Sequence, residues 1–255
     1  MRARSKKTAL KITVLFLMLS FCCGCVTIYN PATERRESLL IDTRQEVSMG
    51  QEMDAQLRKK LKVSQNPAYQ RRLEAIGQRI AAASDRQDLR EYFAVVNDKE
   101  LNAFAIPGGY IYVNSGLMEA ADDNELACVI AHETGHVAAR HSVKKLQAVL
   151  GYQLIVGLAL GLSGQQGVTL QALDVVFNLI NLGYSRKDEF LADKLAVRYA
   201  KRAGFNPYGM VTFFEKLQQE AQRKGQGFNL VYLSSHPPIA ERIKQVKNEI
   251  ASANP

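Results

Sequence analysis

The stretch that decides the fold is His132-Glu133-Thr134-Gly135-His136, inside a helical sequence that runs from Asp123 to about His141. Residues four apart differ by about 40° around a helix, so both imidazoles leave one face and can bind a single Zn²⁺. Zinc lowers the pKa of a water to about 7, and Glu133 could take that proton and pass it to a leaving amine. Without a metal the two histidines would be an ordinary pair, so the motif needs a third ligand.

A second motif, Tyr184-Ser-Arg-Lys-Asp-Glu-Phe-Leu-Ala-Asp193, opens another amphipathic helix and supplies two carboxylates on one face. A catalytic zinc has three protein ligands, and a ligating histidine usually donates its other N–H to a carboxylate. The spacing therefore predicts Glu189 as the third ligand and Asp193 as the partner of His132. The alternative is that both are surface acids that balance Lys187 and Lys194.

The rest of the pattern predicts a mostly helical α+β fold. Apolar residues recur every three or four positions over 44–63 and 67–83, which is typical of helices. Short β-branched and aromatic runs at 91–96, 103–106 and 110–113 predict a small sheet, with a turn at Pro107-Gly108-Gly109. Asp122 or Asp123 can cap the helix that carries the histidines. Cys128 lies one turn before His132 and is expected in the core.

The second predicted strand could bind a substrate. The candidate segment runs from Asn102 to Gly109, and its edge residues are Asn102, Ala103, Phe104 and Ala105. An extended peptide can add to an exposed strand through main-chain hydrogen bonds, which do not depend on side-chain identity. The alternative is a plain hairpin that its neighbours cover.

The first residues are typical of a secretory signal. Five basic and no acidic side chains stand in the first eleven positions, and an apolar run from Ile12 to Phe21 follows that is too short to span a bilayer. Removal of residues 1–24 would lower the net charge from +8 to +3, so the basic balance does not favour nucleic acid. An apolar content of 47% excludes disorder for most of the chain.

The stretch Cys22-Cys23-Gly24-Cys25 resembles a bacterial lipobox, in which the cysteine after a small residue is lipidated and becomes the N-terminus. We therefore expect a signal peptide over 1–24, a lipidated tether over 25–43 and the metallopeptidase domain over 44–255. Val26 in place of Asp resembles the pattern sent to the outer membrane, and the inner membrane is the less favoured location. An uncleaved anchor or a secreted protein with a thiol cluster is the alternative.

Residues 148–162 are apolar apart from Gln153, but fifteen residues fall short of the roughly twenty needed to span a bilayer. Gly157-Leu-Ala-Leu-Gly161 has the small-residue spacing of membrane helix pairs. We expect a buried or membrane-touching hairpin with residues 170–182, and insertion into the bilayer is the alternative.

Several ordered motifs together resemble zinc metallopeptidase family M48, the HtpX and CAAX-prenyl-endopeptidase family, in its bacterial lipoprotein branch. The resemblance implies a zincin-like (gluzincin) fold whose edge strand borders the active-site helix, one Zn²⁺ per chain and endopeptidase activity. The helical repeats that some members carry are not expected after Pro255. The matching stretches are Tyr29-Asn-Pro-Ala-Thr33, 102–109, Asp123-Asn-Glu-Leu126, 132–136 with Arg140-His141, Glu189-Phe-Leu-Ala-Asp193 and Ser235-His-Pro-Pro238.

His236 stands before Pro237-Pro238 and after a glycine-containing segment, where an ordinary loop histidine is the simplest interpretation. The resemblance implies another role, because related lipoprotein peptidases carry a histidine in this loop that can occupy the fourth zinc position and hold the enzyme inactive. A displaced His236 could instead donate to the oxyanion, and Arg242 could share that work.

The sequence thus predicts a zinc metalloendopeptidase on the periplasmic side of the outer membrane, anchored by a lipid on Cys25. Its expected substrates are misfolded or unassembled envelope proteins, with the outer-membrane assembly machinery as a candidate partner and no role for nucleic acid. The competing hypothesis is a zinc-stabilised, non-catalytic assembly factor or chaperone for outer-membrane proteins. Glu133 discriminates between them, because a scaffold needs the metal ligands but has no use for a base.

Replacement of Cys25 by Ser should abolish lipid labelling and release the protein from membranes, because the remaining sequence offers no spanning helix. Metabolic labelling with a fatty acid and membrane fractionation would measure both effects. A variant that stays in the membrane through a carbonate wash would mean that the signal core is uncleaved or that residues 148–182 insert.

Overall fold

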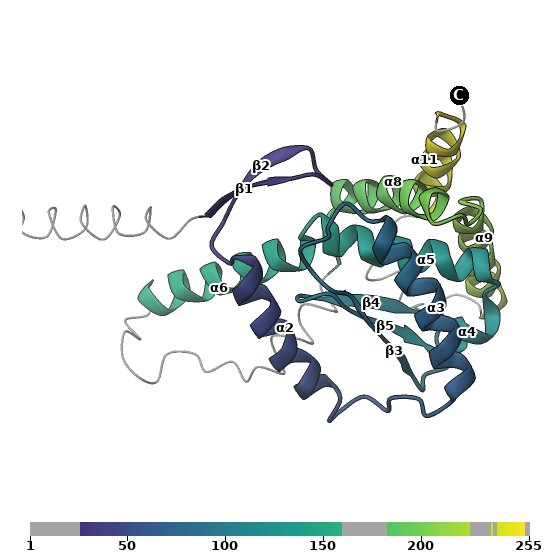
Figure 1. The fold of residues 1–255 in the computed structure, drawn as a ribbon, viewed down its shortest axis with the longest axis horizontal. Coiled ribbons are helices and arrows are strands. Elements are labelled where there is room, and N and C mark those ends of the chain that lie inside the picture. The colour runs from purple at the N-terminus through teal and green to yellow at the C-terminus, as the bar shows by residue number, and fades with distance from the viewer. Residues whose placement is uncertain (1–25, 160–182, 225–235, 237–238, 253–255) are drawn as a thin grey trace, which may run out of the picture.

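A computed structural model describes residues 26–159, 183–224, 236 and 239–252, and it places most of them in helices around two small sheets (Figure 1). The expected mostly helical α+β class is confirmed. The predicted signal peptide, Cys25 and residues 170–182 lie outside the described residues. In chain order the elements are β1 (Val26–Asn30), β2 (Arg35–Leu39), α2 (Thr43–Leu57), α3 (Pro67–Ala83), β3 (Tyr92–Val96), β4 (Ala103–Ile106), β5 (Tyr110–Asn114), α4 (Ser115–Ala120), α5 (Asp123–Ala138), α6 (His141–Ala159), α8 (Arg186–Arg202), α9 (Gly209–Lys224) and α11 (Ile239–Ser252).

The larger sheet has the strand order β3-β5-β4. β4 and β5 form the expected antiparallel hairpin, in which Phe104 lies opposite Tyr112, and β3 runs parallel to β5 on its other side. Among the described strands β4 pairs with β5 alone, so it is an edge strand. It also packs beside α5, which brings the edge next to the helix of the two histidines.

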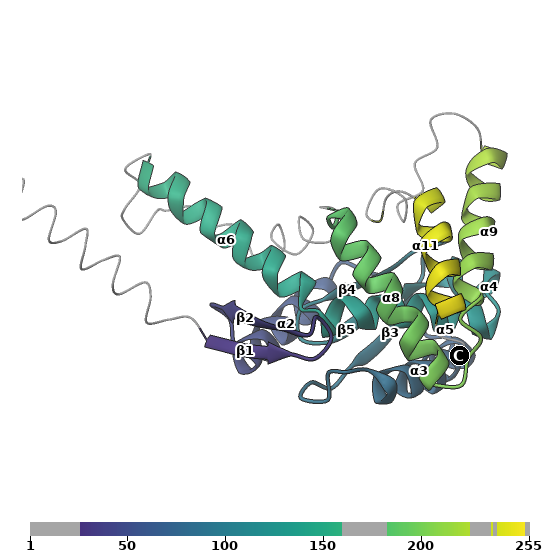
Figure 2. The same ribbon diagram turned by 90° about the horizontal axis from the view of Figure 1, so that it is seen from above.

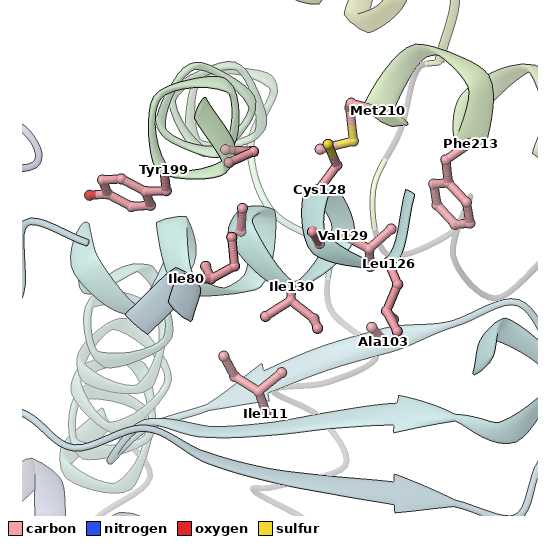
Figure 3. Packing of buried hydrophobic residues seen from close by; sticks show 14 of the residues in the cluster. Ile80, Ala103, Ile111, Leu126, Cys128, Val129, Ile130, Tyr199, Met210 and Phe213 are labelled. Atoms are coloured by element: carbon pink, nitrogen blue, oxygen red, sulfur yellow. The ribbon is translucent and has the colours of Figure 1, made fainter. Parts of the chain in front are cut away.

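Helix α5 is the centre of the core, because all its residues from Glu125 to Ala138 are buried. Figure 3 shows Ile130 directed at Ile111 of the sheet, while Cys128 faces Met210 of α9. A helix that is apolar around its whole circumference must be covered on every side. The sheet, α3, α8 and α9 provide that cover, and the expected burial of Cys128 is confirmed.

The two faces of the sheet contact different helices. Phe93, Ile111 and Val113 belong to the same core cluster as α5, whereas their neighbours Ala94 and Tyr112 pack in a second cluster with α2 and the start of α6. This alternation follows from the two-residue period of a strand. The sheet is therefore buried on both faces, and its strands are almost continuously apolar.

The predicted helix over 67–83 is confirmed, but the one over 44–63 ends earlier, at Leu57. Val63 instead forms a bridge with Val96 at the end of β3, and the Ser64 N–H donates to the carbonyl of Val95. The unpaired side of β3 offers these hydrogen bonds, and a β-branched residue fits an extended strand well. Tertiary pairing thus overrides the helical periodicity of this segment.

The helix predicted to continue to about His141 also ends earlier. α5 stops at Ala138, and Arg140 adopts the left-handed conformation with φ 56°, so that α6 starts in a new direction. Strain at a non-glycine residue persists only where its surroundings fix it. Arg140 is held by Glu46, its Nη1 lying 2.9 Å from Oε2, and by Thr43, whose hydroxyl accepts from Nη2.

The segment expected as a tether contains the β1–β2 hairpin, which lies against the end of α5 (Figure 2). The Asn30 amide donates to the carbonyl of Ala138 over 3.1 Å, and Lys144 of α6 pairs with Glu37 at 2.7 Å. The unpaired carbonyls at a helix end require such partners. Residues 26–39 are therefore joined to the helix of the two histidines.

Of the predicted hairpin at 148–182, the structure describes only the part within α6, up to Ala159. α6 extends away from the rest of the described protein in both views (Figures 1 and 2). Among residues 26–159, 183–224 and 239–252, no helix combines the length and the apolar character needed to cross a membrane.

Two helical glycines provide a matched test of the packing of α2. A Cβ on Gly50 would lie 2.7 Å from Cα of Gly108, whereas a Cβ on Gly151 of α6 would meet nothing within 4 Å. Gly50→Ala should therefore lower the free energy of unfolding by about 1–3 kcal/mol, because backbone must move. Gly151→Ala should raise it by up to about 1 kcal/mol through helix propensity. Urea unfolding measures both, and equal effects would contradict the close contact.

Candidate metal centre

His132 and His136 of α5 and Glu189 of α8 converge in the interior. The two histidine Nε2 atoms lie 3.0 Å apart, and the Glu189 carboxylate lies 3.6 Å from Nε2 of His132 through Oε2 and 3.4 Å from that of His136 through Oε1. His236 joins them, so that one potential ligand atom from each of the four residues lies within 4.8 Å of the others. All four side chains are buried.

Gly135 allows α8 to approach α5 closely enough for this convergence. A Cβ at Gly135 would lie 3.1 Å from the carbonyl oxygen and 3.2 Å from Cα of Ala192. The start of α8 is fixed by Ser185, whose hydroxyl accepts from the Asp188 N–H in a capping box. The glycine of the first motif and the cap of the second therefore set the distance and the start of the helix that carries Glu189.

Asp193 lies where the sequence predicts it, beside His132. Its Oδ1 is 2.9 Å from Nδ1 of His132, and the Arg242 guanidinium donates to both carboxylate oxygens. Burial alone would raise the pKa of Asp193, but the charge and the hydrogen bonds of Arg242 and a hydrogen bond with His132 lower it. The ionised carboxylate can accept the Nδ1–H of His132, which leaves Nε2 with a free lone pair.

Arg242 is fully buried and contacts several groups of the site, among them Nδ1 of His132, which lies 3.3 Å from its Nη2. Besides Asp193, its Nη1 lies 3.0 Å from Oε2 of Glu189 and donates to the carbonyl of His236 over 3.1 Å. Its guanidinium also lies over the Phe214 ring, 4.6 Å from the centroid. These contacts tie α11 to α8, and they favour a role in positioning the two carboxylates over the predicted donation to an oxyanion.

His236 and Glu133 lie next to each other at the cluster. His236 Nδ1 is 2.8 Å from Oε1 of Glu189, and its Nε2 is 3.8 Å from Oε1 of Glu133. Burial opposes charge on His236, but the neighbouring Glu189 raises the pKa of this histidine. Burial raises the pKa of Glu133, whose Oε1 has no hydrogen-bond partner among the described residues.

The donor set fits zinc. Four tetrahedral ligands at about 2.0–2.1 Å from one ion stand roughly 3.3 Å from each other, and the distances of 3.0, 3.4 and 3.6 Å between the His132, His136 and Glu189 atoms bracket that value. Burial drives the pKa of His136 well below its usual value, so its imidazole stays neutral and keeps a lone pair. A buried Glu133 oxygen without a partner is also explained if a polar group binds there.

Two residues of the quoted motifs to which the sequence assigned no role surround His136. Tyr184 stacks on its ring with 4.0 Å between centroids, and Nδ1 of His141 lies 2.8 Å from Nδ1 of His136. Burial lowers the pKa of His141 to about 4. Tyr184 directly precedes the Ser185 cap, but neither position carries a spacing signal that would have identified a contact with His136.

Glu91 lies at the start of a predicted strand, and the sequence assigns it no role. In the structure its side chain contacts α5. Its Oε2 accepts a 2.7 Å hydrogen bond from the hydroxyl of Thr134, which stands between the two histidines, and its Oε1 has no hydrogen-bond partner in the described part of the chain. Burial raises the pKa of Glu91 to about 7. An acidic residue directly ahead of an apolar strand was the only signal in the sequence.

The four residues of the predicted substrate strand lie next to α5. Ala103 and Ala105 belong to the cluster that contains α5, while Phe104 faces the other side of the sheet and stacks on Tyr112. The carbonyl of Asn102 accepts from the Asn114 N–H, and none of the described residues donates to its buried Oδ1. The outer hydrogen-bonding edge of β4 is not paired by any described strand.

Comparisons with known proteins agree with this arrangement. The sequence model of Peptidase family M48 matches residues 67–250. The chain is 32% identical to Metalloprotease LoiP of Escherichia coli (strain K12) over 190 residues, and this alignment covers 73% of each protein. It is 34% identical to Mitochondrial metalloendopeptidase OMA1 of Schizosaccharomyces pombe over 69% of the chain and 51% of OMA1. It is 26% identical to the Beta-barrel assembly-enhancing protease of Escherichia coli (strain K12) over 83% of the chain and 45% of that protein. The chain thus spans about half the length of the last two relatives.

Glu91 predicts a pH-dependent stability. Its carboxyl is protonated in the folded state below a pKa of about 7, whereas the ordinary value is 4.5, so a buried charge destabilises the fold above pH 7 and is relieved as the pH falls. Glu91→Gln keeps an acceptor for Thr134 but carries no charge. The free energy of unfolding of the variant minus that of wild type should be roughly 2–3 kcal/mol more favourable to the variant at about pH 8 than at about pH 5.

Denaturant unfolding at both pH values measures this difference, because all other groups titrate alike in the two proteins. The exposed Glu52→Gln variant is the control and should show no such difference. If the free energies of unfolding of Glu91→Gln and wild type differ by the same amount at both pH values, Glu91 does not change its protonation over this range.

Proposed function

The chain belongs to peptidase family M48 and is a metalloendopeptidase, and from that premise we propose that it cleaves peptide bonds with one Zn²⁺ held by His132, His136 and Glu189. The observation that carries the proposal is the buried convergence of these three side chains beside Glu133. Zinc, when bound, supplies a Lewis acid for the substrate carbonyl and lowers the pKa of water. A zincin-like fold of the gluzincin type is part of the proposal, supported by β4 beside α5.

Glu133 acts as the base. Its carboxylate takes a proton from the attacking water as the water oxygen bonds to the carbonyl carbon, and it gives that proton to the amine nitrogen as the C–N bond breaks. The buried Oε1, which accepts no hydrogen bond from any residue that the structure describes, is the atom available for this transfer. The side chains directly before and after Glu133 point about 100° away from it around the helix, so they are not directed at the same place.

Asp193 and Arg242 hold the histidine and the carboxylate in place. Asp193 accepts from Nδ1 of His132, and Arg242 contacts both Asp193 and Glu189. A charge-assisted bidentate pair fixes the carboxylate plane better than a single hydrogen bond does. Both residues therefore act through the metal ligands and do not touch the substrate.

The substrate binds as an extended strand along β4. Its main chain pairs with Asn102, Ala103, Phe104 and Ala105, whose outer edge no described strand occupies. Main-chain pairing tolerates many sequences, which suits unfolded polypeptides as substrates. β4 packs beside α5, so a strand added there runs past Glu133.

His236 is the resting occupant of the fourth zinc position. Its buried imidazole lies among the other three ligands, 2.8 Å from Glu189, and the Arg242 contact with its carbonyl holds it there. A substrate must displace this histidine before cleavage, so resting activity is low. Residues 225–235 and 237–238, which flank it, lie outside the described residues.

In the cell the enzyme is anchored by a lipid on Cys25 at the periplasmic side of the outer membrane, and it removes misfolded or unassembled envelope proteins. Similarity to Metalloprotease LoiP of Escherichia coli supports the proteolysis, and similarity to the Beta-barrel assembly-enhancing protease of the same organism supports a setting near β-barrel assembly. The name of the second relative extends the proposal to the outer-membrane assembly machinery as a partner.

Replacement of Glu133 by Gln should keep the fold and the bound zinc but lower casein turnover by several orders of magnitude, because the base is lost while every ligand remains. Zinc content by metal analysis and casein cleavage with and without a chelator measure the two properties. Unchanged turnover in the zinc-loaded variant would contradict the role of Glu133, whereas a zinc-loaded wild-type protein that cleaves no casein would favour a non-catalytic, zinc-stabilised assembly factor.

Replacement of His236 by Ala should raise basal casein cleavage and self-cleavage, because the fourth position is freed. If His236 instead donates to the oxyanion, turnover should fall by about two to three orders of magnitude. The absorption spectrum of the cobalt-substituted protein reports the change of the fourth ligand. A variant with both the spectrum and the turnover of wild type would make His236 an ordinary loop residue.

A further inference from the structure

His136 contacts a second histidine through the ring nitrogen that faces away from the metal cluster. Its Nδ1 lies 2.8 Å from Nδ1 of His141, and the two rings meet edge to face with 4.9 Å between centroids. Both side chains are buried. The equivalent atom of His132, its Nδ1, contacts the Asp193 carboxylate. The two proposed histidine ligands therefore have different partners.

The contact exists only because the chain turns at Arg140. Residues five apart on one helix point about 140° from each other, so His136 and His141 would diverge if α5 continued. The left-handed backbone of Arg140 ends α5 and begins α6 with His141, which directs the His141 ring back toward His136. The ion pair of Arg140 with Glu46 stabilises this strained turn.

Proton counting restricts the contact to two arrangements. A hydrogen bond between two ring nitrogens needs one N–H and one lone pair, so only one of the two Nδ1 atoms carries hydrogen. If His141 were the donor, neutral His136 would carry its proton on Nε2, which faces His132 and Glu189 and could not bind a metal. If His136 is the donor, its Nε2 keeps the lone pair.

Asp188 favours the second arrangement. Its Oδ1 lies 3.4 Å from Nε2 of His141, whereas its Oδ2 accepts the hydroxyl hydrogen of Ser185 at the start of α8. A carboxylate stabilises an N–H directed at it, so the proton of His141 belongs on Nε2 and the lone pair on Nδ1. Tyr184, stacked on the face of His136, restricts rotation of that ring.

We propose that His141 is a positioning residue for the metal centre, which accepts the Nδ1–H of His136 and thereby holds His136 with its Nε2 lone pair directed at the ion. The inference rests on the proposed zinc function, and it assigns a role to the Arg140-His141 motif. His141, oriented by Asp188, then accepts the Nδ1–H of His136 as Asp193 accepts the Nδ1–H of His132.

Zinc affinity of the full chain tests the proposal, measured by competition with a chromogenic chelator. His141→Leu removes the acceptor and should weaken zinc binding about 10- to 100-fold. His141→Asn, whose side-chain oxygen can accept near the position of Nδ1, should stay within about threefold of wild type. Cys128→Ala is the control, because Cys128 is buried on the same helix and contacts the carbonyls of Asn206 and Pro207.

A second measurement does not depend on any variant. Nitrogen NMR of the zinc-loaded wild-type protein with labelled histidine should show His136 protonated at Nδ1 and His141 at Nε2. The opposite tautomers, or a folded His141→Leu protein that binds zinc as tightly as wild type, would overturn the proposal. A wild-type protein that binds no zinc would instead overturn the proposed function itself.

Discussion

The complete burial of α5 is the constraint on which the rest of the structure depends. A helix with His132, Glu133 and His136 on its surface would normally expose them, but here every residue from Glu125 onward is covered. Buried polar groups are costly unless they find partners. The helices packed on α5 must therefore supply carboxylates and a guanidinium at fixed positions, and α8 and α11 do so through Glu189, Asp193 and Arg242.

The same constraint explains why distant segments meet along α5. Lys216 of α9 pairs with Glu125 at the first turn over 2.6 Å, and Glu91 accepts from Thr134 in the middle. The Asn30 amide satisfies the carbonyl of Ala138 at the last turn. Each contact supplies a partner to a polar group that burial would otherwise leave without one. Together the contacts fix the helix against rotation about its axis.

Local sequence signals predicted the elements near the site well where no long-range pairing competed. The helix over 67–83 and the hairpin of β4 and β5 follow from apolar periodicity and from the Pro107-Gly108-Gly109 turn. The prediction was wrong at Val63, where the free side of β3 provides hydrogen bonds, and at Arg140, where Glu46 holds a left-handed backbone. Both errors arise from partners tens of residues away, which periodicity does not report.

The sequence by itself determined the donor set of the proposed centre, because the residue types at 132, 133, 136, 189 and 193 and their four-residue spacings on two helices allow these side chains to share one face of each helix. Only the tertiary structure decided which groups complete it. Arg242 bridges two carboxylates, and His141 and Tyr184 surround His136, because packing of α8, α11 and the turn at Arg140 brings together positions that no local period relates. Hydrogen-bond partners in the interior are set by the distances between packed helices, and the sequence does not encode those distances locally.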